Sequence, residues 1–134
     1  MILRLKRHFV DLLSYETDKV YPIEACALLF GRFTTDEAIV DQVEVTQNRL
    51  DSTNHFEVAP EKVAIAVSSA EKEGWELVGL FHSHPFYAAP SEIDFKFMKM
   101  WPDIIWLILS SIDGSIAAFK LIDSKIKKIG IKIE

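Results

Sequence analysis

Two kinds of stretch alternate along the chain. In one, apolar residues recur at every second position, as in strands, and in the other they recur every three or four positions, as in helices. Helical stripes are predicted at residues 6–19, 60–74 and 91–101. Strands are expected at Ile2–Leu5, Ala25–Phe30, 37–46, Trp75–Ser83, Ile104–Ser110, Ser115–Ile122 and 129–133. The order β-α-β-β-α-β-α-β-β-β predicts an α/β fold, in which helices pack on the faces of a mixed sheet.

Within 37–46, the residues Ile39, Val43 and Val45 are expected to mark one face of the strand, which Asp41 shares. The third helix is expected to begin at Ser91 and to end before Pro102. It carries apolar side chains on one side, at Ile93, Phe97, Met100 and Trp101.

Length and charge restrict the classes of function. The 134 residues fit one domain, expected to span 1–134. The 15 basic and 20 acidic residues give a net charge of −5, which argues against a nucleic-acid partner because phosphate binding needs basic surplus. Acidic residues gather in 34–64 and lysines in the last fifteen residues. These stretches are either two solvated faces or a docking surface on one of them.

Cysteine usage and hydropathy indicate the cellular setting. Cys26 is the only cysteine, so an intrachain disulfide is impossible and a reducing cytoplasm is expected. The longest purely apolar run, Ile104–Leu109, is far shorter than the roughly 20 residues that span a bilayer. No membrane partner is therefore expected.

The most informative stretch is Phe81-His82-Ser83-His84-Pro85. In a strand, residues two apart point to the same side, so both imidazoles are expected to project together. The same parity places Val78 and Leu80 on that face. Two protonated imidazoles would repel each other in apolar surroundings, whereas a shared metal ion keeps both neutral.

A carboxylate follows at the start of the third helix, in Ser91-Glu92-Ile93-Asp94. Asp94 there can close a two-histidine site from one side, and two histidines, one carboxylate and a water form the open pattern of catalytic zinc. Two simpler interpretations stay open. Ser91 and Asp94 also form a capping box, and His82 and His84 alone could be ordinary strand histidines.

With Glu24 added, these residues resemble the JAMM (MPN+) family of zinc metalloproteases. Its signature is a glutamate in an early strand, then His-x-His-Pro, then Ser-x-x-Asp, matched here by Glu24, His82-Ser83-His84-Pro85 and Ser91-x-x-Asp94. The resemblance covers nearly the whole chain and implies an MPN (cytidine-deaminase-like) fold with a mixed, curved sheet. One departure is that six residues separate His84 from Ser91, where seven are usual.

The resemblance also implies roles. His82, His84 and Asp94 would hold one Zn²⁺ per chain with water as fourth ligand, Glu24 would act as general base, and Ser91 would steady the oxyanion. The implied reaction is hydrolysis of the isopeptide or peptide bond after the C-terminal glycine of a ubiquitin-like modifier or sulfur-carrier protein. In the loop after the histidines, Phe86 and Tyr87 either line a groove for the substrate tail or simply pack the loop.

Two other functions remain as alternatives. A non-catalytic MPN-type scaffold would bind partners without a metal, although it would not need to keep Glu24, His82, His84, Ser91 and Asp94. A role in DNA metabolism, known for proteins of similar fold, is opposed by the net charge of −5. An exposed edge strand would be compatible with a homodimer.

Overall fold

The computed structural model describes residues 1–48, 50 and 58–134. Over these residues the elements follow the predicted order, and their bounds differ from the predicted ones by a few residues. They are β1 (Ile2–Leu5), α1 (Arg7–Val20), β2 (Cys26–Phe33), β3 (Glu37–Thr46), α2 (Pro60–Lys72), β4 (Glu76–His84), α3 (Glu92–Met98), β5 (Ile105–Ser110), β6 (Ile116–Ile122) and β7 (Lys125–Ile133).

The seven strands form one mixed sheet that closes on itself in the order β1-β3-β2-β4-β5-β6-β7. The short strand β1 closes it, because it pairs in parallel with β3 on one side and with β7 on the other. The parallel pair β4–β5 lies near the middle of the sheet, and the remaining pairs are antiparallel. The predicted mixed sheet with helices on its faces is confirmed, but the sequence did not predict its closure.

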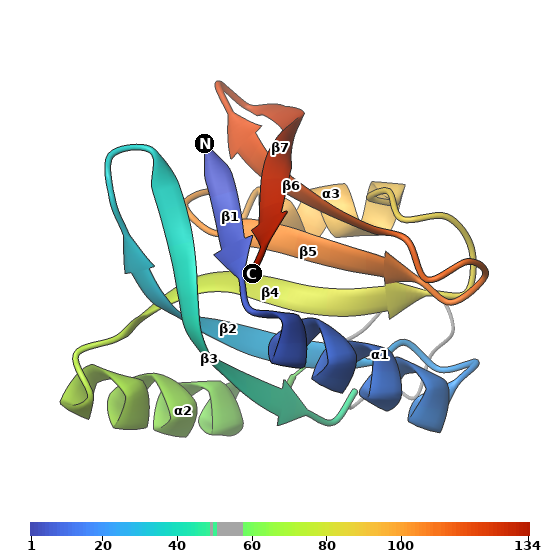
Figure 1. Ribbon diagram of the computed structural model, residues 1–134, viewed down its shortest axis with the longest axis horizontal. Helices are drawn as coiled ribbons and strands as arrows, with labels where there is room; N and C mark the ends of the chain where they lie inside the picture. The colour runs from blue at the N-terminus through green and yellow to red at the C-terminus, as the bar shows by residue number, and fades with distance from the viewer. Residues whose placement is uncertain (49, 51–57) are drawn as a thin grey trace.

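Two apolar clusters lie on opposite faces of this sheet. The inner cluster fills the closed sheet and includes Phe9 and Leu13 of α1. The outer cluster covers β2, β4, β5 and β6 and includes Ala70 of α2 and Met98 of α3. Figure 1 accordingly shows α1 in front of the sheet and α3 behind it. Each strand of the central part is therefore covered by protein on both sides.

The predicted face of β3 is wrong over part of its length. Gly31 pairs with Val40 and Phe30 with Gln42, so Asp41 is an extra residue in a β-bulge. Because a bulge shifts the alternation by one residue, the buried residues are Ala38 and Val40 before it and Val43 after it. Ile39 is only half-buried, and Val45 is exposed.

The predicted face of β4 is also wrong at one position, because the strand contains a second bulge. Leu29 pairs with Gly79 and Phe30 with Leu77, which leaves Val78 as the extra residue. Val78 therefore points into the inner cluster, whereas Leu80 belongs to the outer one. From Leu80 onward the alternation is regular, and the expectation for the two histidines further along the strand is unaffected.

The third helix is shorter than predicted, and the residues that it buries are not the predicted ones. It ends at Met98, and Asp94 and Met98 are its buried residues. The side chains of Phe97, Met100 and Trp101 are exposed by 38%, 71% and 42%. The apolar stripe expected there is thus partly solvent-facing, and the helix turns a carboxylate inward instead.

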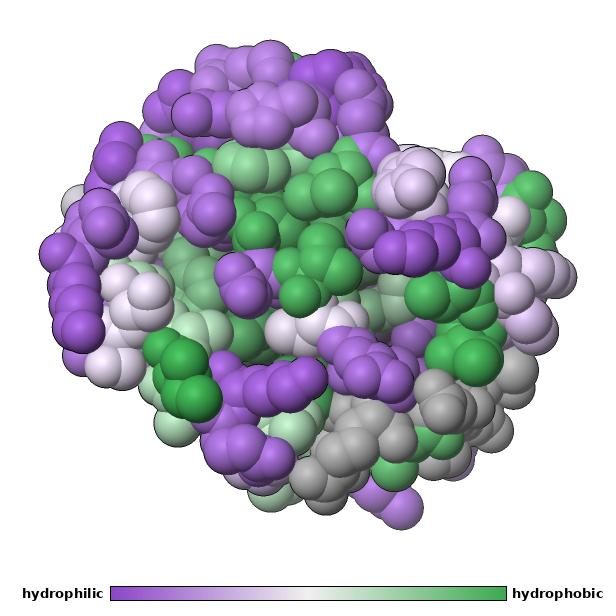
Figure 2. Space-filling view, turned by 90° about the horizontal axis from the view of Figure 1, so that it is seen from below, coloured by the Kyte–Doolittle hydropathy of each residue, from purple (hydrophilic) through white to green (hydrophobic). Residues whose placement is uncertain are grey.

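Among the described residues, no helix combines the length and the apolar character that crossing a bilayer requires. Figure 2 shows the molecule from below. On this face apolar side chains gather in patches, and hydrophilic side chains are more numerous along the rim.

Candidate metal centre

The two histidines come from the end of β4, which lies between β2 and β5. His82 and His84 are both completely buried. As the strand alternation predicts, their rings project to the same side, and their Nε2 atoms lie 3.0 Å apart. Burial lowers the pKa of the His82 imidazole, against the opposing effect of its contact with Asp94, so the neutral ring is favoured.

Asp94 brings a carboxylate to the same point from the first turn of α3. Its Oδ2 atom lies 3.1 Å from the Nε2 of His82 and 3.1 Å from the Nε2 of His84. The predicted capping box is confirmed, because Asp94 N donates to Ser91 Oγ at 3.1 Å and Ser91 N donates to Asp94 Oδ2 at 3.0 Å. The carboxylate of Asp94 therefore both caps α3 and contacts the two histidines.

The charge of Asp94 reflects two opposing effects. Burial alone would raise its pKa, but the hydrogen bonds to His82, His84 and the Ser91 backbone outweigh burial and hold the pKa well below its usual range. The carboxylate is therefore ionised at neutral pH. Two imidazoles and one carboxylate form a donor set that zinc accepts.

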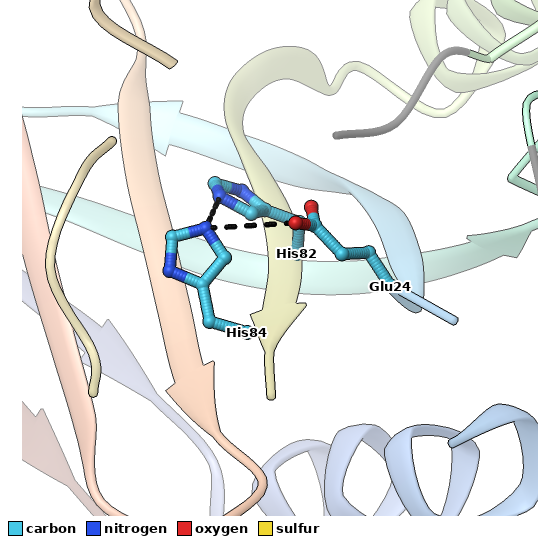
Figure 3. Close-up of side chains that lie close together, drawn as sticks. All are labelled: Glu24, His82 and His84. Carbon is cyan, nitrogen blue, oxygen red and sulfur yellow. Dashed lines mark hydrogen bonds and ion pairs between the residues drawn. The ribbon is translucent and has the colours of Figure 1, made fainter. Parts of the chain in front are cut away.

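Glu24 lies just before β2, and its side chain points toward both histidines (Figure 3). It is completely buried, and its Oε2 atom lies 3.9 Å from His84 Nε2. Neither carboxylate oxygen has a hydrogen-bond partner among the described residues. Burial, with a smaller contribution from the charge of Asp94, raises the pKa of Glu24 to about 8.

Two overlapping sets of residues could hold a metal ion. Glu24, His82 and His84 offer ligand atoms that all lie within 4.8 Å of one another. However, Asp94 Oδ2 lies 0.8 Å closer to His84 Nε2 than Glu24 Oε2 does, at 3.1 Å against 3.9 Å. A tetrahedral zinc site places neighbouring ligand atoms roughly 3.3 Å apart. The distances among His82, His84 and Asp94 fit this value better.

The two aromatic residues of the following loop lie at different depths. Phe86 stacks on His84, with ring centroids 4.5 Å apart and an interplanar angle of 25°. Tyr87 is 73% exposed and contacts the edge of Phe86. Phe86 thus packs against a candidate ligand. A substrate groove at these residues stays a prediction.

Sequence reasoning missed two residues that contact the Glu24 segment. Asn48 Nδ2 donates to the Glu24 carbonyl oxygen at 3.1 Å, and Ala25 N donates to Ser83 Oγ at 2.8 Å. No pattern in the chain connects Asn48 with Glu24. For Ser83 a signal exists, because a polar residue inside a buried strand needs a hydrogen-bond partner.

Comparison with known sequences gives related proteins over most of the chain. Residues 6–121 match the model of the prokaryotic homologs of the JAB domain. A desampylase of Pyrococcus furiosus is 40% identical over 114 residues, which are 84% of this chain and 77% of that protein. A desampylase of Haloferax volcanii is 27% identical over 115 residues, 84% of this chain and 80% of the other.

Solved structures with the same fold extend over nearly all of the chain. A protein of Desulfitobacterium hafniense, solved in solution, has a TM-score of 0.86 and 30% identity over 100% of this chain and 93% of its own. A protein of Salinibacter ruber, also solved in solution, has a TM-score of 0.71 and 26% identity over 97% and 91%. With its buried histidine pair and the family match over residues 6–121, the chain belongs to the family of prokaryotic homologs of the JAB domain, which confirms the resemblance drawn from its motifs.

Proposed function

We propose that the protein is a zinc-dependent isopeptidase that hydrolyses the bond after the C-terminal glycine of a ubiquitin-like modifier or sulfur-carrier protein. The observation that carries the proposal is the convergence of His82, His84 and Asp94 on one buried point, with the Glu24 carboxylate beside it. Two relatives are named desampylases, enzymes that remove a ubiquitin-like modifier from conjugates, which supports this class of substrate.

His82, His84 and Asp94 hold the ion in this proposal. A zinc ion held there would lower the pKa of a coordinated water to about 7 and so supply hydroxide at neutral pH. A divalent cation beside Glu24 would favour its ionised form. In that form Glu24 would accept the proton of the attacking water and pass it to the leaving amine, a step typically worth about 10²–10⁴-fold.

Ser91 has a second task in the same reaction. Its Oγ accepts the Asp94 N–H, which leaves the hydroxyl hydrogen available for donation. We assign this hydrogen to the oxyanion that forms on the substrate carbonyl. The hydrogen bonds between Ser91 and Asp94 support this assignment.

The test combines metal content with cleavage of a ubiquitin-like protein fused through its C-terminal glycine. We expect about one zinc per wild-type chain and cleavage that a chelator abolishes. Asp94→Ala should lose both, whereas Glu24→Gln should keep the metal and lose cleavage by about 10²-fold or more. Glu92→Gln is the matched control, because Glu92 is an exposed carboxylate on the same helix.

Two results would reject the proposal in different ways. A wild-type protein that binds no zinc would leave Ser91 and Asp94 as a helix cap only. A protein that binds zinc through these residues but cleaves no glycine-tailed fusion would instead be a binding module of this family.

We also expect a cytoplasmic protein, since its one cysteine is buried and reduced.

A further inference from the structure

Within the described part of the chain, no side chain donates a hydrogen bond to the Glu24 carboxylate. Both oxygens are buried, and among the described residues they have no hydrogen-bond partner. The Nε2 atom of His84 lies 3.9 Å from Glu24 Oε2, beyond hydrogen-bond distance. Glu24 also precedes the first residue of β2, so strand pairing at its own position does not fix it. Among the contacts that the structure describes, the hydrogen bonds of the adjacent backbone are therefore the ones that can set the direction of the Glu24 side chain.

Two side chains hold that backbone from opposite directions. On one side, Asn48 Nδ2 donates to the Glu24 carbonyl oxygen at 3.1 Å. On the other side, Ala25 N donates to Ser83 Oγ at 2.8 Å, and Ser83 N donates to Ala25 O at 3.0 Å. The peptide group that joins Glu24 to Ala25 is thus hydrogen-bonded at both its carbonyl and its N–H.

The two partners are themselves well fixed. Asn48 Oδ1 accepts the backbone N–H of Leu50 at 3.0 Å, which determines which end of its amide faces Glu24. Ser83 is 1% exposed and lies between His82 and His84 on the most buried part of β4. Because neighbouring strand residues point to opposite faces, its hydroxyl lies on the face away from the histidine rings. Ser83 is therefore no candidate ligand.

We infer that Ser83 and Asn48 are positioning residues, which fix the peptide group after Glu24 and thereby aim its carboxylate at the reacting water. The inference rests on the proposed role of Glu24 as the base. A base works only within hydrogen-bond reach of its proton, and a displacement of about 1 Å at a reacting group can cost 10²-fold in rate. Ser83 thus connects the strand that carries both histidines to the segment that carries the base.

The first measurement needs neither metal nor substrate. In the metal-free protein, hydrogen exchange of the Ala25 amide should be slow in the wild type and in Ser83→Thr, which keeps a hydroxyl. It should be at least about tenfold faster in Ser83→Ala, because the amide loses its acceptor. Exchange unchanged in Ser83→Ala would overturn the hydrogen bond on which the inference depends.

The second measurement separates positioning from folding. Ser83→Ala and Asn48→Ala should each retain about one zinc per chain, with kcat lowered roughly 10- to 100-fold and KM within about twofold. Ser83→Thr should restore most of kcat. Ser110→Ala is the matched control, because it removes another buried serine that accepts a backbone N–H, that of Ile112, at 3.2 Å. Its kcat should stay within about twofold of wild type.

A double-mutant cycle gives the decisive outcome. If Ser83 acts through Glu24, adding Ser83→Ala to Glu24→Gln should lower the residual kcat by less than about twofold. An equal loss in both backgrounds, or loss of zinc from Ser83→Ala, would overturn the inference and assign Ser83 to general stability or to the histidines. An active wild type with unchanged kcat in both single variants would overturn the inference alone. An inactive, zinc-loaded wild type would reject the proposed function and this role with it.

Discussion

The two ring nitrogens of His84 are supported differently, since Nε2 contacts Asp94 Oδ2 at 3.1 Å. Metal-binding histidines usually donate their second ring N–H to a carboxylate, a carbonyl or water. Among the described residues the Nδ1 atom of His84 has no hydrogen-bond partner. The stacked ring of Phe86, 4.5 Å away between centroids, packs against the imidazole and can help to restrain it.

Replacing Phe86 should therefore weaken metal binding. We expect Phe86→Leu to lower zinc affinity by about tenfold, the lower end of the loss when a ligand's supporting partner is removed. Tyr87→Leu, which alters an exposed ring in the same loop, should stay within about twofold. Competition titration against a chromophoric chelator measures both, and equal affinities in the two variants would show that the stack does not support His84.

The lone cysteine offers a test of the reaction class. Cys26 is 2% exposed, and burial raises the pKa of its thiol to about 11, with an opposing hydrogen bond from Thr46. At pH 8 only about one thiol in a thousand is ionised, so native Cys26 should react slowly with alkylating reagents. We expect iodoacetamide to leave cleavage unchanged, while a chelator abolishes it. Inhibition by iodoacetamide would point to a cysteine nucleophile instead.

At the level of single residues, local patterns predicted which side chains would converge. They could not predict contacts between residues that lie far apart in the sequence. His82 and His84 follow from strand alternation, and the placement of Asp94 follows from a capping box four residues long. Asn48 and Glu24 are 24 residues apart, and only the folded sheet brings them together. Since periodicity reports one element at a time, it carries no information on such pairs.

At the level of elements, the types and order could be predicted, but two strand faces could not. The extra residues of the two bulges, Asp41 in β3 and Val78 in β4, both lie opposite the Phe30 region of β2. A bulge reverses the alternation on one side of it, and its position depends on the partner strand. The predicted faces of β3 and β4 were therefore wrong on one side of each bulge.

At Gly31, beside the first bulge, the backbones of β2 and β3 approach each other closely. A Cβ atom at this position would lie 1.8 Å from the carbonyl oxygen of Ile39, so a side chain requires the strands to move apart. We expect Gly31→Ala to destabilise the protein by about 1–3 kcal/mol or more. Gly130→Ala is the control, because its Cβ would meet Ile2 at an ordinary 3.6 Å. Urea unfolding of both variants measures the difference, and equal midpoints would argue against the close approach.

At the level of the whole molecule, β1 turns an open sheet into a closed one. Leu3 pairs with Ala38 of β3 on one side and with Ile131 of β7 on the other. The chain ends reinforce the closure, since Glu134 N donates to Leu5 O and Arg7 N donates to Glu134 O. Parallel pairing of the first and last strands leaves no local pattern, which is why the closure was not predicted.

Because β1 joins both edges, Leu3 should matter more for stability than its short strand suggests. The side chain is completely buried in the inner cluster, and its removal leaves a cavity between β3 and β7. We expect Leu3→Ala to lower the free energy of unfolding by about 2–5 kcal/mol. Ile2→Ala, in the same strand but 42% exposed, should cost far less.

The same variant separates the closure of the sheet from the metal centre. His82, His84 and Asp94 lie on the outer face with α3, whereas Leu3 lies on the inner face. Folded Leu3→Ala at low temperature should therefore still bind about one zinc per chain, with an affinity within a few-fold of wild type. Loss of zinc from a protein that remains folded would mean that closure at β1 shapes the end of β4, and that the two faces of the sheet are coupled.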